Sequence, residues 1–217
     1  MLRLTVFTFV FLGLFETGCG VDLPTAKVAI VGRFTKGPVD VATEVDAAEF
    51  NDRFGSELPQ NFPAEAQVRQ FFRNGGTSLS VVRVDPLATP GGAISGSFDP
   101  SHLRGLGALL PRSDLGLLLC PELSDLNQSD FGKCLAGIEI LGKDRPLFTL
   151  LDPPASTQTI AEMVAWRGQI TDGDLAHAAT YFPKIEVDPA SWSDGSSGEL
   201  MTMGASGTGV TESCGKC

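Results

Sequence analysis

The sequence predicts an α/β protein: a mixed sheet with covering helices, an N-terminal extended arm and an irregular C-terminal tail. Short apolar runs rich in β-branched residues recur along the chain, and stretches with helical apolar spacing lie between them. After Pro189 the sequence turns to Ser, Gly and Thr, and no further packed element is expected. Strands that alternate with helices imply right-handed crossovers within one sheet.

The stretch 61–84 is the clearest element pair, with a helix, a sharp stop and a buried strand. Asn61 can cap the helix, and Gly75 with Gly76 ends it, because glycine readily adopts the left-handed conformation of a helix stop. The strand is expected over 77–84. The apolar face of the helix is predicted to pack on the sheet: Ala64, Val68, Phe71 and Phe72.

The rest of the first half supplies two strands and a short helix. The strands are expected at 26–34 and 39–45, and Asp46 can cap a helix through Phe50 and Phe54. Residues 86–99 are rich in Pro, Gly and Ser and are typical of a linker or surface loop.

The second half repeats the strand–helix rhythm. Strands are expected at 115–120, 146–151 and 181–187. Ser129 is expected to cap one helix that ends at Gly142, with an apolar face of Phe131, Cys134, Leu135 and Ile138. Thr159 and Glu162 have the spacing of a capping box, and the helix they begin is expected to pack through Ile160, Met163, Val164 and Arg167.

The expected organisation has five parts. Residues 21–85 and 100–189 are two α/β parts of one domain, joined by 86–99, and 190–217 form a flexible Ser/Gly-rich tail. Residues 1–20 have two interpretations. Arg3, the apolar run 4–15 and Gly18-Cys19 are typical of a secretory or lipoprotein signal, whereas a strand-forming Phe, Val and Thr content favours an extended arm.

Charge and cysteine content exclude several classes. A formal net charge of −10 argues against nucleic acid as a partner, and no apolar stretch after the N-terminus has the length of a membrane span. Cys120 and Cys134 lie in apolar patterns and are expected in the core. Cys19, Cys214 and Cys217 complete an odd, irregular set, and the terminal C-x-x-C alone is a poor zinc or redox motif.

No catalytic, cofactor-binding or metal-binding residues are predicted. The run Gly204–Thr211 lacks the lysine of a phosphate-binding loop because Val210 follows Gly209. Asp152 ends a predicted strand, where α/β enzymes often place catalytic groups, but the sequence favours the simpler interpretation that Asp-Pro-Pro is a strand-ending turn. His102 and His177 have no partner at metal-ligand spacing. We therefore expect no enzyme activity, no cofactor and no small-molecule ligand.

Several strings resemble landmarks of the contractile tail sheath proteins of phages and related injection systems. GVDLPTAKVAIVGRFTKGPVD resembles the opening of that family, and VRQFFRNGGTSLSVVRVDP is similar to its helix–Asn-Gly-Gly–strand signature. Further strings match in order: LGLLLCPELSD, RPLFTLLDPP, MVAWRGQI and ATYFPKIEVDP. The resemblance covers residues 20–189.

The resemblance implies a structural subunit that polymerises with other copies around an inner tube, contacts baseplate proteins and drives the tube out by contraction. It implies a phage-like particle, in a virion tail or in the bacterial cytoplasm, and extended arms that add strands to neighbouring subunits. Family members continue beyond the point where this sequence stops, so a C-terminally truncated copy is expected. The alternative, resting on residues 1–20, is a secreted or lipid-anchored α/β binding protein.

Overall fold

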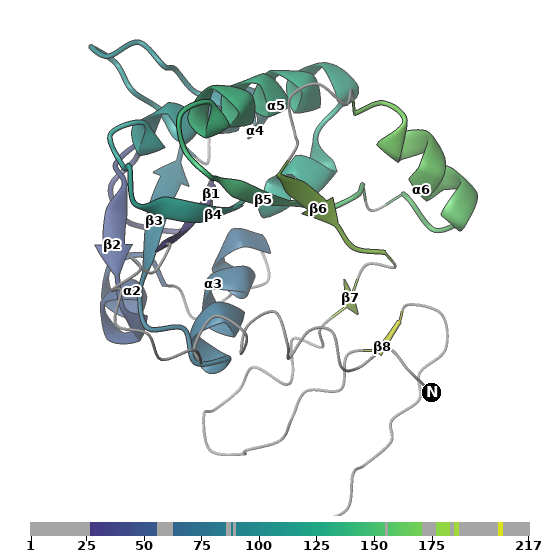
Figure 1. Ribbon diagram of the computed structural model, residues 1–217. Coiled ribbons are helices and arrows are strands. Elements are labelled where there is room, and N and C mark those ends of the chain that lie inside the picture. Colours follow the sequence, from purple (N-terminus) through teal and green to yellow (C-terminus); the bar gives the residue numbers. More distant parts are fainter. Residues whose placement is uncertain are drawn as a thin grey trace, which may run out of the picture.

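The computed structural model describes residues 27–55, 63–85, 88, 90–154, 156–170, 177–182, 185–186 and 204–205. Six strands of this part form one mixed sheet in the order β2-β3-β1-β4-β5-β6, and β7 pairs with β8 apart from it (Figure 1). The strands are β1 (Lys27–Arg33), β2 (Thr43–Val45), β3 (Leu79–Val84), β4 (Leu115–Leu119), β5 (Phe148–Leu151), β6 (Ala178–Thr180), β7 (Ile185–Glu186) and β8 (Gly204–Ala205). The α/β fold class is confirmed.

The sheet is parallel except for its edge strand β2. β1 pairs in parallel with β3 on one side and β4 on the other, and β5 and β6 extend the parallel part. β2 runs antiparallel to β3. The parallel strands therefore lie in the order β3-β1-β4-β5-β6, which is the arrangement of flavodoxin-like doubly wound sheets.

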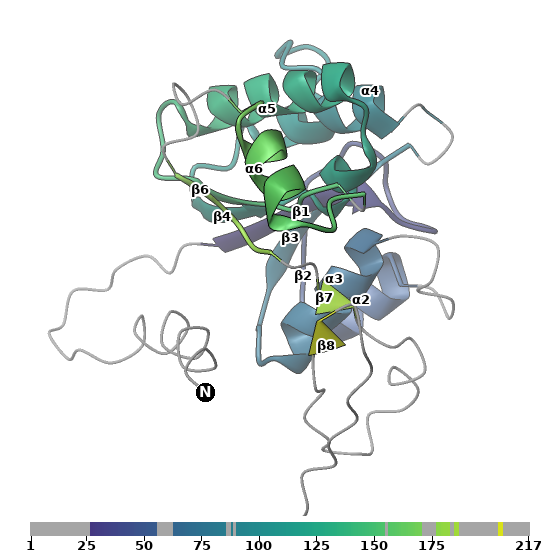
Figure 2. The ribbon, with the colours of Figure 1, turned by 90° about the vertical axis from the view of Figure 1, so that its right-hand side faces the viewer.

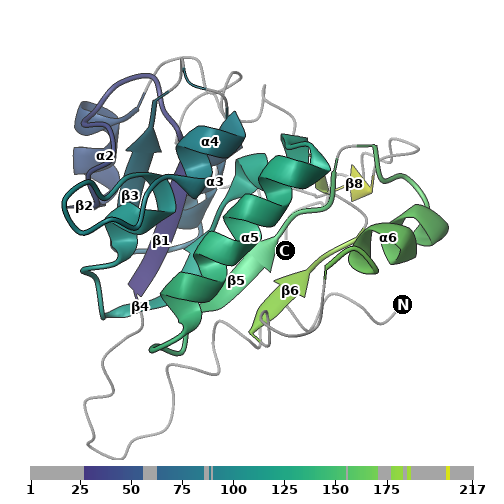
Figure 3. The same ribbon diagram turned by 90° about the horizontal axis from the view of Figure 1, so that it is seen from above.

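Helices cover the two faces unequally (Figures 1 and 2). α4 and α5 lie on one face, and α2 and α3 lie on the other, where α3 contacts β1 and α2 contacts β2. Seen from above, α5 runs along the sheet and α6 lies beside β6 (Figure 3). The helices are α2 (Ala47–Arg53), α3 (Pro63–Arg73), α4 (Pro90–Ser95), α5 (Gln128–Gly142) and α6 (Ile160–Arg167), with the 3-10 helices η2 (Gly105–Leu109) and η3 (Pro121–Asp125).

Each face has its own apolar core. The larger core lies between the sheet and α4, α5 and η2, and includes Ile94, Leu118 and Ile138. The smaller core lies under α2 and α3, where the rings of Phe34 and Phe50 meet edge to face with centroids 5.9 Å apart.

The central helix–strand pair is confirmed. α3 begins at Pro63, while Asn61, the expected cap, lies outside the described residues. Ala64 and Val68 are buried, and Phe71 and Phe72 are half-buried against the smaller core. Gly75 has a φ of +90°, as the helix stop requires.

The predicted helix caps Asp46 and Thr159 are both confirmed. Asp46 accepts from the backbone N–H of Glu49, and Thr159 accepts from that of Glu162, with each glutamate bonding back to the cap. The cap of α5 differs from the prediction. The side chain of Asn127 accepts from the N–H of Asp130, so the helix begins two residues earlier than predicted, and Ser129 lies inside its first turn.

Of the predicted packing face of α6, Met163 packs against the larger core, but Ile160 and Val164 do not. Ile160 is 75% exposed and Val164 is 66% exposed, whereas Trp166 is buried and its ring lies 5.9 Å from that of Phe131 on α5. α6 lies beyond the edge of the sheet, so it buries only the side that α5 faces (Figure 3).

Three other boundaries differ. The segment 86–99, expected to be a linker or loop, contains α4, whose Ile94 is fully buried in the larger core. The strand expected at 39–45 is reduced to β2, because Asp40 has a φ of +58° and breaks the extended run. The strand expected at 181–187 lies at 178–180 instead, where it pairs with β5, and Ile185–Glu186 pairs with β8.

Candidate functional site

The carboxyl edge of the parallel sheet is the first place to look for a site. In doubly wound folds, ligands bind in the crevice where the strand order reverses, outside the carboxyl ends of the strands. Here the reversal lies between β1 and β4. The chain that leaves β4 turns directly into η3, which packs against β1, α3 and β5.

Glu122 of η3 fills this crevice. Its side chain is fully buried, and both carboxylate oxygens lie 3.0 Å from the backbone nitrogen of Arg33, which donates its N–H to them. The guanidinium Nε of Arg33 lies 3.5 Å from Oε1. Burial raises the pKa of Glu122, and the hydrogen bond and charge of Arg33 oppose that rise. A carboxylate of the chain itself thus occupies the position where an anionic ligand would meet backbone N–H groups.

α3 closes the crevice from the other side. A Cβ added to Gly32, the residue before Arg33, would lie only 2.4 Å from the Cβ of Ala64. Glu65, also fully buried, accepts from Nη2 of Arg69 at 3.1 Å. The close contact of β1 with α3 leaves no room for a bound group beside Gly32.

Asp152 lies at the end of β5, as predicted, and it contacts α3. Its Oδ2 accepts from Nε2 of Gln67 at 3.2 Å. The aspartate, which directly follows β5, therefore links the end of that strand to α3. This hydrogen bond between a strand end and a helix supports a structural contact.

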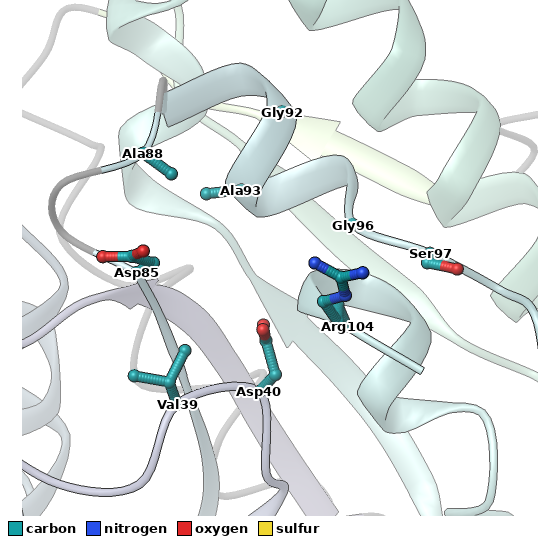
Figure 4. Close-up of a pocket in the computed structure, with 9 residues that line it drawn as sticks. All are labelled: Val39, Asp40, Asp85, Ala88, Gly92, Ala93, Gly96, Ser97 and Arg104. Carbon is teal, nitrogen blue, oxygen red and sulfur yellow. The ribbon is translucent and has the colours of Figure 1, made fainter. Parts of the chain in front are cut away.

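A hollow of about 400 Å³ lies at the end of β3 (Figure 4). Asp40 stands at its rim, with its carboxylate accepting from the N–H of Gly105 at 2.8 Å and its own N–H donating to the carbonyl of Arg83. Figure 4 shows the Arg104 side chain extending from the opposite wall. The lining residues are Val39, Asp40, Asp85, Ala88, Gly92, Ala93, Gly96, Ser97 and Arg104. The lining thus carries one guanidinium, two carboxylates and one hydroxyl.

The other predicted chemical groups are separated. His102 is exposed in the turn before η2, with Nδ1 3.1 Å from Oγ of Ser101, and the backbone carbonyl of His177 accepts from Thr149 on β5. Within the described ranges, no three His, Cys, Asp or Glu residues are grouped as a metal site would require.

The cysteines expected in the core are there. Cys120 and Cys134 are buried free thiols, and burial raises the pKa of Cys134 to about 12 and also raises that of Cys120. The predictions for Cys19, Cys214 and Cys217 lie outside the described residues. Of the near-miss glycine run, only Gly204–Ala205 is described, as strand β8.

The sequence interpretation missed Glu122 and Arg33. Arg33 ends β1 and Glu122 lies in η3, and the available signal was a single acidic residue inside the apolar run LLLCPEL. A lone glutamate in such a run is seldom left buried without a partner.

Comparison with known proteins found a similarity among solved structures. No protein-family model matches the sequence, and no curated protein matches it. Among solved structures, the chain is similar to the helical sheath of the anti-feeding prophage (AFP) in its contracted state, with a TM-score of 0.48 and 18% identity. The match covers 81% of this chain and 45% of that one, so this chain spans less than half of the AFP sheath chain. A likeness at this level carries no functional argument. In the described part of the chain, no helix is both long and apolar enough to cross a membrane.

Proposed function

We propose that this chain is a structural subunit of a contractile tail sheath and has no enzymatic role. One observation carries the proposal: the strings that resemble the sheath family occur in family order from residue 20 to 189. VRQFFRNGGTSLSVVRVDP begins within α3 and continues through β3, LGLLLCPELSD covers β4 and η3, and RPLFTLLDPP contains β5. The strings therefore belong to consecutive elements of one sheet.

The chemistry of the crevice supports a structural role. The carboxylate of Glu122 and the contact of Gly32 with Ala64 fill the space that a nucleotide or other anion would need. In the proposed assembly, other copies of the subunit, an inner tube and a baseplate are the partners, and contraction consumes no nucleotide.

Immunogold electron microscopy tests the proposal. Antibodies are raised against the purified chain and applied to phage-like particles sedimented from cells that carry the gene, with pre-immune serum as the control. The proposal predicts gold along the outer sheath of contractile particles, in their extended and contracted forms. Label confined to other fractions, with contractile particles present and unlabelled, would remove the sheath assignment.

The second candidate is a secreted or lipid-anchored α/β binding protein. Arg3, the apolar run 4–15 and Gly18-Cys19 favour it. Mass spectrometry of the protein from its own cells separates the two: this candidate requires cleavage after Gly18 and lipid on Cys19, and Cys19→Ser should abolish the lipid. An intact N-terminus would eliminate it.

A further inference from the structure

Strand β1 extends beyond its neighbour β4 at the carboxyl edge of the sheet. The two strands pair only as far as Ile30 and Leu119, whereas β1 continues to Arg33. β4 ends at Leu119 and the chain turns into η3, so the main-chain N–H of Arg33 lies beyond the last register pair. A main-chain N–H that is buried needs an acceptor, because leaving it without one is strongly destabilising. At this point the acceptor comes from outside the strands.

Glu122 supplies this acceptor with an ionisable group, although a neutral carbonyl would satisfy the N–H. Both carboxylate oxygens lie 3.0 Å from the nitrogen of Arg33, and the guanidinium Nε lies 3.5 Å from Oε1. A main-chain N–H and a guanidinium that face one carboxylate are the groups with which proteins bind free carboxylates and phosphates. The contact therefore has the chemistry of an anion-binding site.

The walls around the carboxylate belong to elements other than η3. Gly32 of β1 lies so close to α3 that an added Cβ would be 2.4 Å from the Cβ of Ala64, which is fully buried. The same helix is held to the end of β5 by the hydrogen bond from Gln67 to Asp152. These contacts do not involve Glu122. We therefore expect the walls to remain in place when that side chain is shortened.

The space that Glu122 fills has the size of a small carboxylate. Glu122→Ala removes Cγ and the carboxylate group, which together are the heavy atoms of acetate. The side chain is fully buried, so the space left behind is enclosed. An enclosed space in a protein can bind a small molecule of matching shape and polarity. Here the N–H and guanidinium of Arg33 remain beside it, so the matching molecule is an anion.

We propose that the crevice is a preformed carboxylate-binding site for which the chain supplies its own ligand, the side chain of Glu122. A free carboxylate of acetate size binds there once that side chain is removed. In the wild type the tethered carboxylate excludes free anions, because its effective concentration at the site is high. The proposal rests on the geometry of β1, η3 and α3, and it does not depend on the proposed sheath function.

Rescue of Glu122→Ala by acetate at pH 7 tests the site. The variant should melt below the wild type in sodium chloride, because the N–H of Arg33 has lost its acceptor. Sodium acetate of equal ionic strength should raise the Tm of the variant by about 3–6 °C over chloride when acetate is at about ten times its Kd. Formate should give a smaller gain because it leaves part of the space empty, and butyrate should give none because it is too large.

Glu122→Gln is the matched control. It loses the same charge as Glu122→Ala but fills the space, so acetate and chloride should give the same Tm, as they should for the wild type. A gain of equal size in Glu122→Gln or in the wild type would overturn the proposal, since acetate would then act elsewhere.

Absence of an acetate gain in Glu122→Ala would also overturn it, because the crevice would then have collapsed without its own carboxylate. Should this variant be unfolded in chloride, far-UV circular dichroism during an acetate titration replaces the melt. Refolding in acetate is then the expected result, and a chain that stays unfolded at every acetate concentration counts against the site.

The main-chain amide resonance of Arg33 gives a second readout that is specific to the site. In Glu122→Ala it should move in NMR spectra as acetate is added, because the anion accepts from that N–H. The amide of Gly132 should not move, since Gly132 belongs to α5 on the opposite face of the sheet (Figure 1). A Tm gain in which the Arg33 resonance stays fixed would place the acetate at another site and contradict the proposal.

Discussion

Gly32→Ala is expected to displace α3 from the carboxyl end of β1. The new Cβ would lie 2.4 Å from the Cβ of Ala64 and 3.4 Å from Oε2 of Glu122. Carbon atoms pack at about 3.5–4.0 Å, so the helix would have to retreat by about 1 Å. Overpacking of this kind costs about 1–3 kcal/mol. For a chain of this size, each kcal/mol lowers the Tm by about 2–4 °C.

Urea denaturation followed by circular dichroism measures the effect. Ala64→Gly removes the opposing Cβ and alone should cost up to about 1 kcal/mol, the helix penalty of glycine. If the contact causes the loss, the double variant should be less destabilised than the sum of the two single variants. Gly132→Ala is the matched control, because no atom lies within 4 Å of its added Cβ. Strict additivity, or a Gly32→Ala variant as stable as the wild type, would refute the reasoning.

Three further outcomes are expected. Phe50→Ala should lower the free energy of unfolding, measured in urea, by about 3–5 kcal/mol, because the Phe50 ring is fully buried. Phe71→Ala should lower it clearly less, because that ring is only half-buried. The opposite order would contradict the described packing. Arg112 beside Asp114 holds the pKa of that carboxyl at about 2, below its ordinary 3.8. The stabilisation that the ionised Asp114 contributes should therefore be complete above pH 4 and lost as the pH falls toward 2. The Tm values of the wild type and Asp114→Asn should converge over that interval, and parallel plots of Tm against pH would count against the ion pair. Cys120 and Cys134 should resist iodoacetamide in the native protein and react in urea, because burial raises the pKa of both thiols. Peptide mass spectrometry measures the alkylation. Alkylation of Cys134 in the native protein would mean that the larger core opens.

Local chemistry explains which predictions from the sequence were accurate. Capping boxes involve residues three positions apart, so Asp46 and Thr159 identified their helix starts without tertiary information. Gly75 marked the end of α3 for a similar reason, since its left-handed conformation is a local need. The apolar strands β1, β3, β4 and β5 were found by their apolar and β-branched composition, which is a local property of each strand.

Predictions that depended on neighbouring elements were less accurate. α6 buries Trp166 rather than Ile160 and Val164, because α5 contacts only that side. The glycine-rich segment 86–99 gave no helical pattern, yet Gly91 lets α4 approach Asp130 on α5 so closely that an added Cβ would lie 2.2 Å from the aspartate Cβ. Spacing along one segment does not report such contacts.

The sequence by itself determined the class of fold and most element positions, because these depend on periodicity, caps and local composition. The tertiary structure alone decided the strand order, and with it the meeting of Arg33 and Glu122, which lie 89 positions apart. The order also placed α3 against β1, whereas Phe148 on β5 is 40% exposed. Strand order is set by the summed burial of many distant residues, and no single segment of the sequence carries that information.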